Sequence, residues 1–283
     1  MLSPIWVEPL KVERLTIAIA DLPSSLVGLK LVQLSDLHYD GFCLSDQLLE
    51  QTIYISNQEN PDLVLLTGDY ITDEPTPIKI LSYRLKSLHS KNGIFACLGN
   101  HDIYYPNAGT KVTKALKSAG IEVLWNAIAT PFGPNFPIVG LADYWSRDFK
   151  SGLAIMDQLN PNVPRIVLSH NPDTAEILKK WRVDLQLSGH THGGQVFIPG
   201  LGSAPMIGQH LRQILPKSVQ KFIPYLQCSQ IVKHWEWGQG YHCIGSNQLY
   251  VNRGLGTYFP GRFFCPPELT VITLINSNVL SKF

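Results

Sequence analysis

Five short apolar runs, each followed at once by a small polar cluster, constrain the fold of this chain most strongly. They are LKLVQL then SDLH (ending at His38), DLVLL then TGD (Asp69), GIFACL then GNHD (Asp102), RIVL then SHNPD (Asp173), and VDLQL then SGHTHGG (Gly194). Runs of four to six residues rich in Val, Ile and Leu are typical of strands that are buried on both faces. The sequence therefore predicts five such strands, each of which ends in polar side chains.

Helical patterns separate several of these runs. Apolar spacing of three and four residues, with capping residues at the ends, predicts helices over residues 44–56, 78–88, 108–118 and 173–180. Strands that alternate with helices predict an α/β fold with a largely parallel sheet and helices outside it. Ligands bind such sheets at the carboxyl ends of the strands, so we expect all five polar clusters on one edge. YHCIG, LYVN and LTVITLI, near the end of the chain, are expected to complete a second sheet or its edge.

The segment from residue 199 to residue 240 breaks this rhythm. Its apolar residues recur at roughly helical spacing, with basic residues and two prolines between them. We expect a single domain over residues 1–283, with an insertion of short helices at about 199–240 beside the site. Packing against the rest of the domain is the favoured role for it, followed by a lid over the substrate. A third alternative is contact of residues 201–237 with a membrane surface, which Trp235 and Trp237 favour.

Charge and cysteine content exclude several classes of protein. The 283-residue chain has a formal net charge of +1, which is too little to attract nucleic acid, so no nucleic-acid partner is expected and a nuclease is disfavoured. The five cysteines lie far apart without a C-x-x-C pair, which argues against a disulfide framework or a structural zinc site. No apolar run approaches the roughly 18 residues of a membrane span, and no export signal is evident. We expect a soluble cytoplasmic protein.

The polar clusters supply donors for metal ions. The candidates are Asp36, His38, Asp69, Asn100, His101, Asp102, His170, His190 and His192. Carboxylate, amide oxygen and imidazole are the ligands expected of manganese, iron or zinc, and the absence of a thiolate disfavours a closed structural site. The number of donors exceeds what one ion needs. Two transition-metal ions (Mn, Fe or Zn) fit the set better.

The spacing of these donors indicates how they divide. Asp36 and His38 are two apart on a segment expected to be extended, so both side chains project to one side. The same reasoning lets His190 and His192 each serve a different ion. The two oxygens of Asp69 make it the natural bridge. Glycines 68, 99 and 189 each precede a candidate ligand, which fits sharp turns or close approach of the backbone.

Two such ions predict a reaction. Ions about 4 Å apart lower the pKa of a shared water and stabilise the attacking and leaving oxygens of an in-line displacement, which is the chemistry of phosphoester hydrolysis. His101 is a candidate to donate a proton to the leaving oxygen or to contact a phosphoryl oxygen. Asp102 is expected to orient that imidazole.

The order of the motifs resembles a known family. D-x-H, G-D, G-N-H-D, an isolated His and G-H-x-H are similar to the motifs of the calcineurin-like metallophosphoesterase superfamily. V-N-R-G-L-G and R-F-F-C-P-P-E-L, within residues 251–269, resemble its bacterial branch of YkuE- and YaeI-like phosphodiesterases. The resemblance implies a four-layer α/β/β/α sandwich with His101 as the catalytic acid or a transition-state contact. It also implies one ion held by Asp36, His38, Asp69 and His192, and a second held by Asp69, Asn100, His170 and His190.

Other polar residues are less informative. Four histidines lack ligand spacing and are expected on the surface or in loops: His89, His210, His234 and His242. Arg253 and Arg262 flank a glycine-rich turn, where they either grip phosphate or simply close the sheet.

The function predicted from all these features is a dinuclear metal-dependent hydrolase of phosphoester bonds. The activity expected is that of a phosphodiesterase or pyrophosphatase-type enzyme that acts on a small molecule or a lipid headgroup. The alternatives are a non-catalytic scaffold stabilised by metal and a nuclease.

Overall fold

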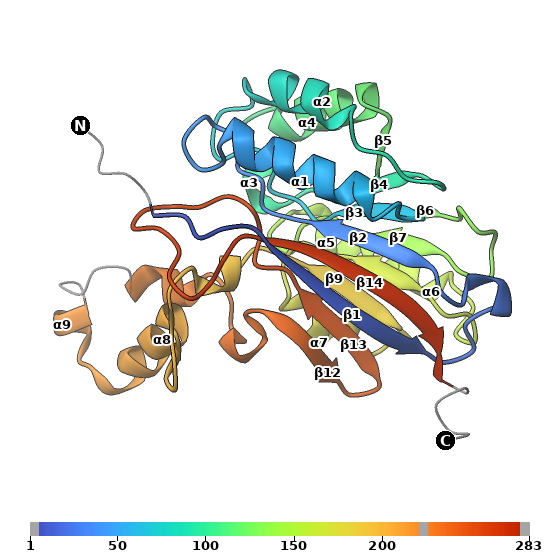
Figure 1. Ribbon diagram of the computed structural model, residues 1–283. Helices are drawn as coiled ribbons and strands as arrows, with labels where there is room; N and C mark the ends of the chain where they lie inside the picture. Colours follow the sequence, from blue (N-terminus) through green and yellow to red (C-terminus); the bar gives the residue numbers. More distant parts are fainter. Residues whose placement is uncertain (1–5, 221–225, 278–283) are drawn as a thin grey trace.

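Two stacked sheets form the centre of the protein (Figure 1). The computed structural model describes residues 6–220 and 226–277. Within them the first sheet has the order β1 (Lys11–Ile19), β14 (Glu268–Asn276), β2 (Lys30–Leu34), β3 (Leu63–Leu66), β4 (Ile94–Ala96) and β5 (Ile121–Val123). The second has the order β12 (Gly240–Ile244), β13 (Asn247–Val251), β9 (Leu185–Ser188), β8 (Ile166–Leu168), β7 (Ile138–Gly140) and β6 (Ala127–Ala129).

The five predicted strands are confirmed as β2, β3, β4, β8 and β9, but they are divided between the two sheets. Strands β2 to β5 run parallel in the first sheet, and β7, β8, β9 and β13 run parallel in the second. The expectation that one sheet edge carries all five clusters is therefore wrong. The clusters meet because the two sheets are stacked with these edges together. LTVITLI is also placed differently from expectation, since β14 lies in the first sheet between β1 and β2.

Alternation along the strands explains why two layers of sheet form. In β3, Leu63 and Leu65 pack into the core between the sheets, while Val64 and Leu66 pack against helices. Successive side chains of a strand point to opposite faces, so a strand with an apolar layer on each side is apolar throughout.

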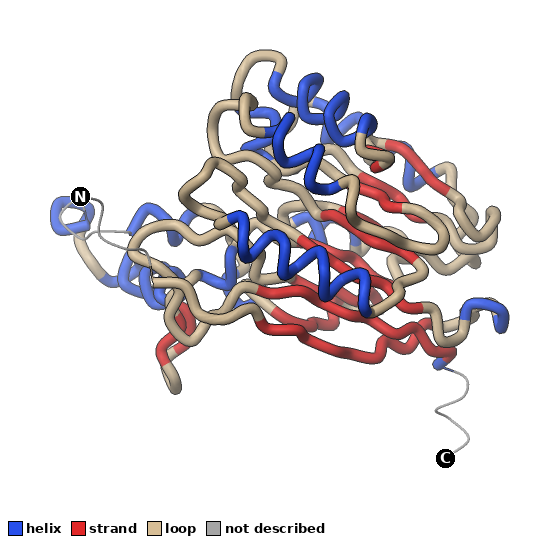
Figure 2. The backbone as a smooth tube through the Cα atoms, turned by 45° about the horizontal axis from the view of Figure 1, so that its top comes forward, coloured by secondary structure: helices blue, strands red, loops and turns tan. Residues whose placement is uncertain are grey.

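Helices cover both outer faces (Figure 2). Helices α1 (Asp46–Gln58), α2 (Ile78–Leu85) and α4 (Ala108–Ser118) pack on the first sheet, and α5 (Asp148–Gly152), α6 (Ala154–Asp157) and α7 (Thr174–Leu178) pack on the second. Helix α1 begins after Ser45, whose hydroxyl accepts a hydrogen bond from the Leu48 amide at 3.2 Å. The four-layer α/β/β/α sandwich that the resemblance implies is confirmed.

Short elements occupy most of the segment 199–240 and lie at one end of the sandwich (Figure 1). They are β11 (Gly202–Ser203), which pairs with β10 (Phe197–Ile198), then α8 (Ala204–Ile214), α9 (Lys217–Gln220), η3 (Leu226–Gln230) and η4 (Trp235–Trp237). Residues 221–225 of this segment lie outside the described part of the chain. In the described ranges, 6–220 and 226–277, no helix has the length and apolar character needed to cross a bilayer.

Candidate metal centre

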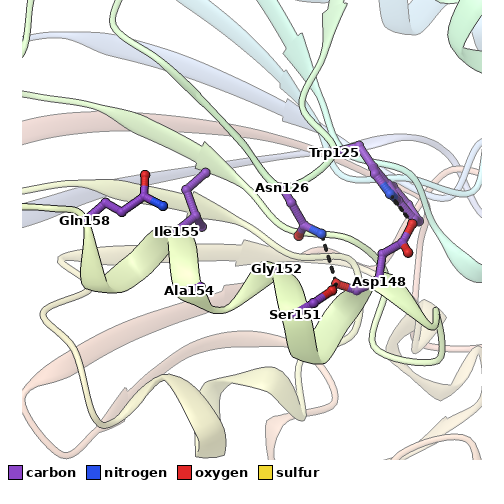
Figure 3. Close-up of a pocket in the computed structure, with 8 residues that line it drawn as sticks. All are labelled: Trp125, Asn126, Asp148, Ser151, Gly152, Ala154, Ile155 and Gln158. Atoms are coloured by element: carbon purple, nitrogen blue, oxygen red, sulfur yellow. Dashed lines mark hydrogen bonds between the residues drawn. The ribbon is translucent and has the colours of Figure 1, made fainter.

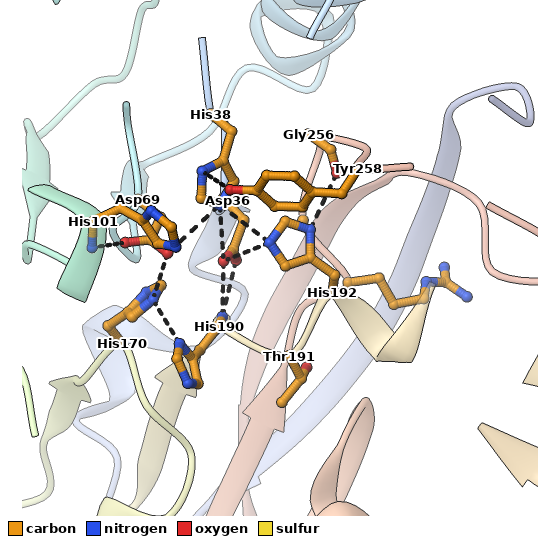
Figure 4. A network of polar contacts seen from close by, with 12 residues as sticks. Asp36, His38, Asp69, His101, His170, His190, Thr191, His192, Gly256 and Tyr258 are labelled. Carbon is orange, nitrogen blue, oxygen red and sulfur yellow. Dashed lines mark hydrogen bonds and ion pairs between the residues drawn. The ribbon is translucent and has the colours of Figure 1, made fainter. Parts of the chain in front are cut away.

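Residues far apart in the sequence converge where the strands of both sheets end (Figure 4). Asp36 and His38 follow β2, Asp69 follows β3, His170 follows β8, and His190 and His192 follow β9. Asn100, His101 and Asp102 form the first turn of α3 (Asn100–Tyr104), directly after β4. The fold therefore brings together the nine candidate residues that the sequence pattern predicts.

The backbone of these loops has an unusual conformation. Eleven non-glycine residues in the described chain have a positive φ, and five of them are candidate ligands: Asp36, His38, Asp69, His190 and His192. Such conformations are costly for non-glycine residues and concentrate at functional sites. The prediction that Asp36 and His38 share an extended segment is wrong, because their φ angles are 49° and 44°. Backbone hydrogen bonds to Gly68 and Asp69, both 3.0 Å long, hold this curved segment.

Two glycines allow the loops to approach closely. A Cβ atom at Gly99 would lie 2.1 Å from Oδ1 of Asp69, and one at Gly189 would lie 2.1 Å from Oδ2 of Asp36. Both distances are far shorter than any van der Waals contact. The predicted role of these glycines in close approach is confirmed.

The imidazole and carboxylate groups form two clusters. In the first, Nε2 of His192 lies 3.5 Å from Oδ1 of Asp36 and 3.1 Å from Nε2 of His38. In the second, Nε2 of His170 lies 3.0 Å from Oδ2 of Asp69 and 3.2 Å from Nδ1 of His190. Because the same Oδ2 atom is also 3.5 Å from Nε2 of His38, Asp69 lies between the two clusters.

Each of these four imidazoles is oriented by a hydrogen bond on the far side of its ring. The partners are the Tyr258 hydroxyl for Nδ1 of His38 (2.7 Å), the Thr67 carbonyl for Nδ1 of His170 (2.7 Å), the Ile231 carbonyl for Nε2 of His190 (3.2 Å) and the Gly256 carbonyl for Nδ1 of His192 (3.1 Å). A carbonyl accepts only from a protonated nitrogen, so in His190 and His192, whose pKa values burial lowers, the opposite nitrogen keeps its lone pair. Outer hydrogen bonds of this kind fix the tautomer of a histidine that binds metal.

Asn100 supplies a further observation. Its Oδ1 atom is buried and has no hydrogen-bond partner among the described residues. Buried amide oxygens are almost always paired, because an unpaired one loses its interaction with water and gains nothing. Its position among the histidines and carboxylates fits an oxygen that binds a cation. The donor set as a whole, nitrogen and oxygen without sulfur, fits manganese, iron or zinc.

Burial and mutual charge set the protonation of the cluster. Burial lowers the pKa of His38 and of His190 to about 3, so both are neutral and available as ligands. Burial also acts to lower the pKa of His170. The attraction of the adjacent Asp69 carboxylate is stronger than this effect and raises the pKa of His170 to about 10. Burial raises the pKa of Asp36 to about 6. Without an ion the cluster holds a proton on His170, which a bound cation would displace.

His101 lies beside the cluster, and its Nδ1 atom contacts the Thr72 carbonyl. Its ring stands edge-on to that of His38, with centroids 4.9 Å apart.

Asp102 has partners other than the His101 imidazole that we expected it to orient. Its buried carboxylate accepts hydrogen bonds from the backbone amides of Asp69, Tyr70 and Gly99, each 2.8 Å long. The first turn of α3 directs this carboxylate back toward the preceding loop, so Asp102 holds two loops in place.

Three residues of the loop after β13 complete the surroundings. Sequence reasoning missed Tyr258, because a single tyrosine in a glycine-rich loop carries no ligand spacing. Arg253 forms ion pairs of 2.7 Å with Glu13 and Glu268. The buried Arg262 donates to backbone carbonyls, among them those of Arg253 and Gly256 at 2.8 and 2.7 Å. These contacts favour the structural alternative for both arginines.

The remaining histidines and a second pocket lie apart from the cluster. His89 and His210 are exposed, and His234 and His242 are partly exposed. A pocket of about 410 Å³ beside α5 is lined by Trp125, Asn126 and Asp148 (Figure 3). The Trp125 indole donates to the Asp148 carboxylate at 2.9 Å, and the Asn126 amide donates to the Asp148 carbonyl at 3.0 Å. The polar groups of these three residues thus engage one another.

The chain is similar to known proteins. Residues 29–194 match the calcineurin-like phosphoesterase family. The chain is 34% identical to the phosphodiesterase YaeI of Escherichia coli, over 87% of this chain and 82% of the relative. It is 33% identical to the metallophosphoesterase YkuE of Bacillus subtilis (96% and 89%) and 29% identical to the UDP-2,3-diacylglucosamine pyrophosphatase LpxG of Chlamydia trachomatis (96% and 93%). The crystal structure of TT1561 from Thermus thermophilus has a TM-score of 0.50 and 13% identity, covering 81% of this chain and 90% of that one, which supports the fold alone.

Proposed function

This chain belongs to the calcineurin-like phosphoesterase family and is a phosphoester hydrolase, and on that premise we propose that it uses two metal ions to hydrolyse a phosphodiester or pyrophosphate-type bond. The observation that carries the proposal is the position of Asp69. One of its carboxylate oxygens lies within 3.5 Å of His38 in one cluster and 3.0 Å of His170 in the other. A carboxylate between two sets of imidazoles is suited to bridge two cations.

Two sets of residues would hold the ions. Asp36, His38, Asp69 and His192 form one set, and Asp69, Asn100, His170 and His190 form the other. The ligand atoms of Asp36, His38 and His192 lie within 4.8 Å of one another, as do those of Asp69, His170 and His190. The unpaired Oδ1 atom of Asn100 supports its place in the second set. Such ions, when bound, activate a water molecule and offset the charge of the phosphoryl group.

His101 would supply the proton that the reaction needs. The water oxygen forms a bond to phosphorus and gives up a proton to solvent, the bond from phosphorus to the leaving oxygen breaks, and that oxygen takes up the proton from Nε2 of His101, which solvent then restores. The Thr72 carbonyl engages Nδ1 of His101 and leaves Nε2 for this transfer. Asp102 keeps the loops of Asp69 and Gly99 together through three backbone hydrogen bonds, which makes it a positioning residue.

We propose a small-molecule or lipid-headgroup phosphoester as the substrate. The names of the relatives support it, since one is a phosphodiesterase and another is a pyrophosphatase of a diacylated sugar nucleotide. The net charge of +1 gives no field that would gather a nucleic acid.

The proposal is tested with a generic aryl phosphodiester and manganese-loaded protein. We expect release of the aryl alcohol, and we expect it to stop when a chelator removes the metal and to return when manganese is restored. A fully loaded protein that hydrolyses no mono- or diester would overturn the proposal.

We further propose that the surface beside this site touches a membrane. Exposed apolar side chains gather where the β10–β11 hairpin meets the loop around residue 260: Ile198, Leu201, Phe259 and Phe263. The Phe197 amide joins the two segments by donating to the Phe263 carbonyl at 2.9 Å. This surface shares only Leu201 with residues 201–237, and Trp235, which favoured that segment, is buried and lines the cavity beside the site instead.

Co-sedimentation with phospholipid vesicles tests the membrane contact. We expect Leu201→Glu to weaken binding, because it places a charge in the apolar surface. Tyr83→Glu is the matched control, since Tyr83 is also a large exposed side chain (74%, against 64% for Leu201) but lies on α2, on the outer layer of helices. Equal binding by both variants, or no binding by the unaltered protein, would contradict the contact.

A further inference from the structure

A cavity of about 790 Å³ extends from the candidate metal centre to the elements that follow β10. Asp69, Asn100 and His190 line its polar end. The remainder is lined mainly by apolar side chains from the residue before β10, from α8 and η3, and from the segment that leads into η4: Val196, Ile207, Leu211, Leu226, Ile231 and Trp235. One continuous space thus joins a polar centre to an apolar chamber.

Helix α8 turns its apolar face into this cavity. Ala204, Ile207, Gly208 and Leu211 all line it, and their spacing of three and four residues places them on one face of the helix. Gly208 lies against η3, where a Cβ atom would meet Leu226 at 3.5 Å. Ile207 and Leu211 nevertheless stay partly exposed, and neither belongs to a hydrophobic core cluster of the described residues.

Three side chains that line the apolar chamber have polar groups that are already engaged. The Thr191 hydroxyl donates to the Gly238 carbonyl at 2.6 Å, and the Trp235 indole donates to the Ser229 carbonyl at 3.0 Å. The side-chain oxygen of Gln195 accepts from the Tyr258 amide at 2.6 Å. A nucleobase or sugar would need such groups to be free, because its own polar atoms lose their water when they are buried. An aliphatic chain has no such requirement.

The apolar wall begins next to the candidate ligands. His190 donates from Nε2 to the carbonyl of Ile231 at 3.2 Å, and Ile231 itself lines the chamber. Trp145 stands edge-on to the His190 ring, with centroids 5.1 Å apart. The apolar wall therefore starts at a candidate ligand, so the apolar part of an occupant would begin close to its phosphorus.

We infer that the cavity binds an aliphatic chain of the substrate, so that the substrate is an amphiphile whose chain is attached close to the phosphoester. This inference rests on the proposed function for the position of the phosphoester. The location of the aliphatic chain rests on the lining of the cavity alone.

The test compares two soluble substrates that differ only in chain length, the ethyl and decyl esters of p-nitrophenyl phosphate, each used as a monomer with manganese-loaded protein. Each buried methylene contributes about fourfold to binding. We therefore expect kcat/KM to be at least tenfold higher for the decyl ester. The binding of ethylphosphonate and decylphosphonate, measured by calorimetry, provides a readout that is independent of hydrolysis.

Two variants test whether the aliphatic chain of the substrate lies in the apolar chamber. Leu211→Asp places a charge in the apolar chamber, and Ala204→Trp fills the chamber from an exposed position that puts little strain on the fold. Both should lower the decyl-to-ethyl ratio to near one, in hydrolysis and in phosphonate binding. Ile214→Asp is the control, because Ile214 is 75% exposed on the same helix and does not line the cavity. It should keep the ratio.

The outcomes separate this inference from the proposed function. Hydrolysis of both esters at equal rates would leave the phosphoesterase standing and overturn the chain assignment. A preference for the decyl ester that survives in both cavity variants would place the chain elsewhere and would also overturn it. If neither ester is hydrolysed, the proposed function fails. Even then, tighter binding of decylphosphonate than of ethylphosphonate, abolished by both cavity variants, would support the binding of an aliphatic chain in the cavity.

Discussion

Replacing Gly189 with alanine should disrupt the metal centre, because the added Cβ atom would lie 2.0 Å from the Ser35 hydroxyl oxygen and also against the Asp36 carboxylate. Gly189 has no positive φ, so alanine imposes no backbone strain there. Its Cβ atom, however, would lie 2.1 Å from Oδ2 of Asp36, whereas ordinary contacts begin at 3.4 Å, so the carboxylate must move by about 1.3 Å. The move breaks the hydrogen bonds of 2.9 and 3.1 Å that Asp36 accepts from the His190 amide.

A displacement of about 1 Å in a catalytic arrangement costs roughly 100-fold in rate, and we expect at least that loss in kcat/KM for an aryl phosphodiester. Metal analysis by mass spectrometry should also show fewer ions per chain, because Asp36 belongs to one of the two ligand sets. Gly109→Ala is the control, since its nearest neighbour is a methyl group of Ile103 at 3.3 Å. A folded Gly189→Ala protein with the metal content and rate of the unaltered enzyme would refute the reasoning.

Three further substitutions test individual roles. Asp69→Asn should abolish hydrolysis and lower the metal content, and normal metal content with a normal rate would remove Asp69 from the bridging position. His101→Ala should keep both ions but lose roughly 10²- to 10⁴-fold in rate, most for esters with poor leaving groups, and a fall in metal content would instead make His101 a ligand. Tyr258→Phe removes the partner of Nδ1 of His38 and should weaken metal binding by about 10- to 100-fold; unchanged affinity in a metal titration would show that the hydroxyl does not orient the ring.

The sequence alone predicted the clusters better than the arrangement of the strands that carry them. Short apolar runs reveal a buried strand, because side-chain alternation is the same in any sheet that is covered on both faces. They do not reveal which strands pair, so the residues alone did not place β8 and β9 in a second sheet. The second sheet was predicted from the family resemblance instead. The position of β14 between β1 and β2 is likewise a matter of pairing over more than two hundred residues.

The same limit applies within the site. Motif spacing identified the ligand candidates, but contacts that depend on the tertiary fold stayed hidden. Tyr258 reaches His38 across 220 positions of sequence, and Asp102 turns to the amides of Asp69 and Tyr70 instead of to its neighbour His101. Helical spacing predicted short helices between residues 199 and 240. It did not show that the apolar face of α8 lines a cavity.

The most direct test of the account is a titration of metal-free protein with manganese during hydrolysis of an aryl phosphodiester. We predict that the rate rises until two ions are bound per chain and then stays constant, with both ions confirmed by mass spectrometry of the native protein. Saturation of the rate at one ion per chain, or full occupancy by two ions without turnover, would contradict it.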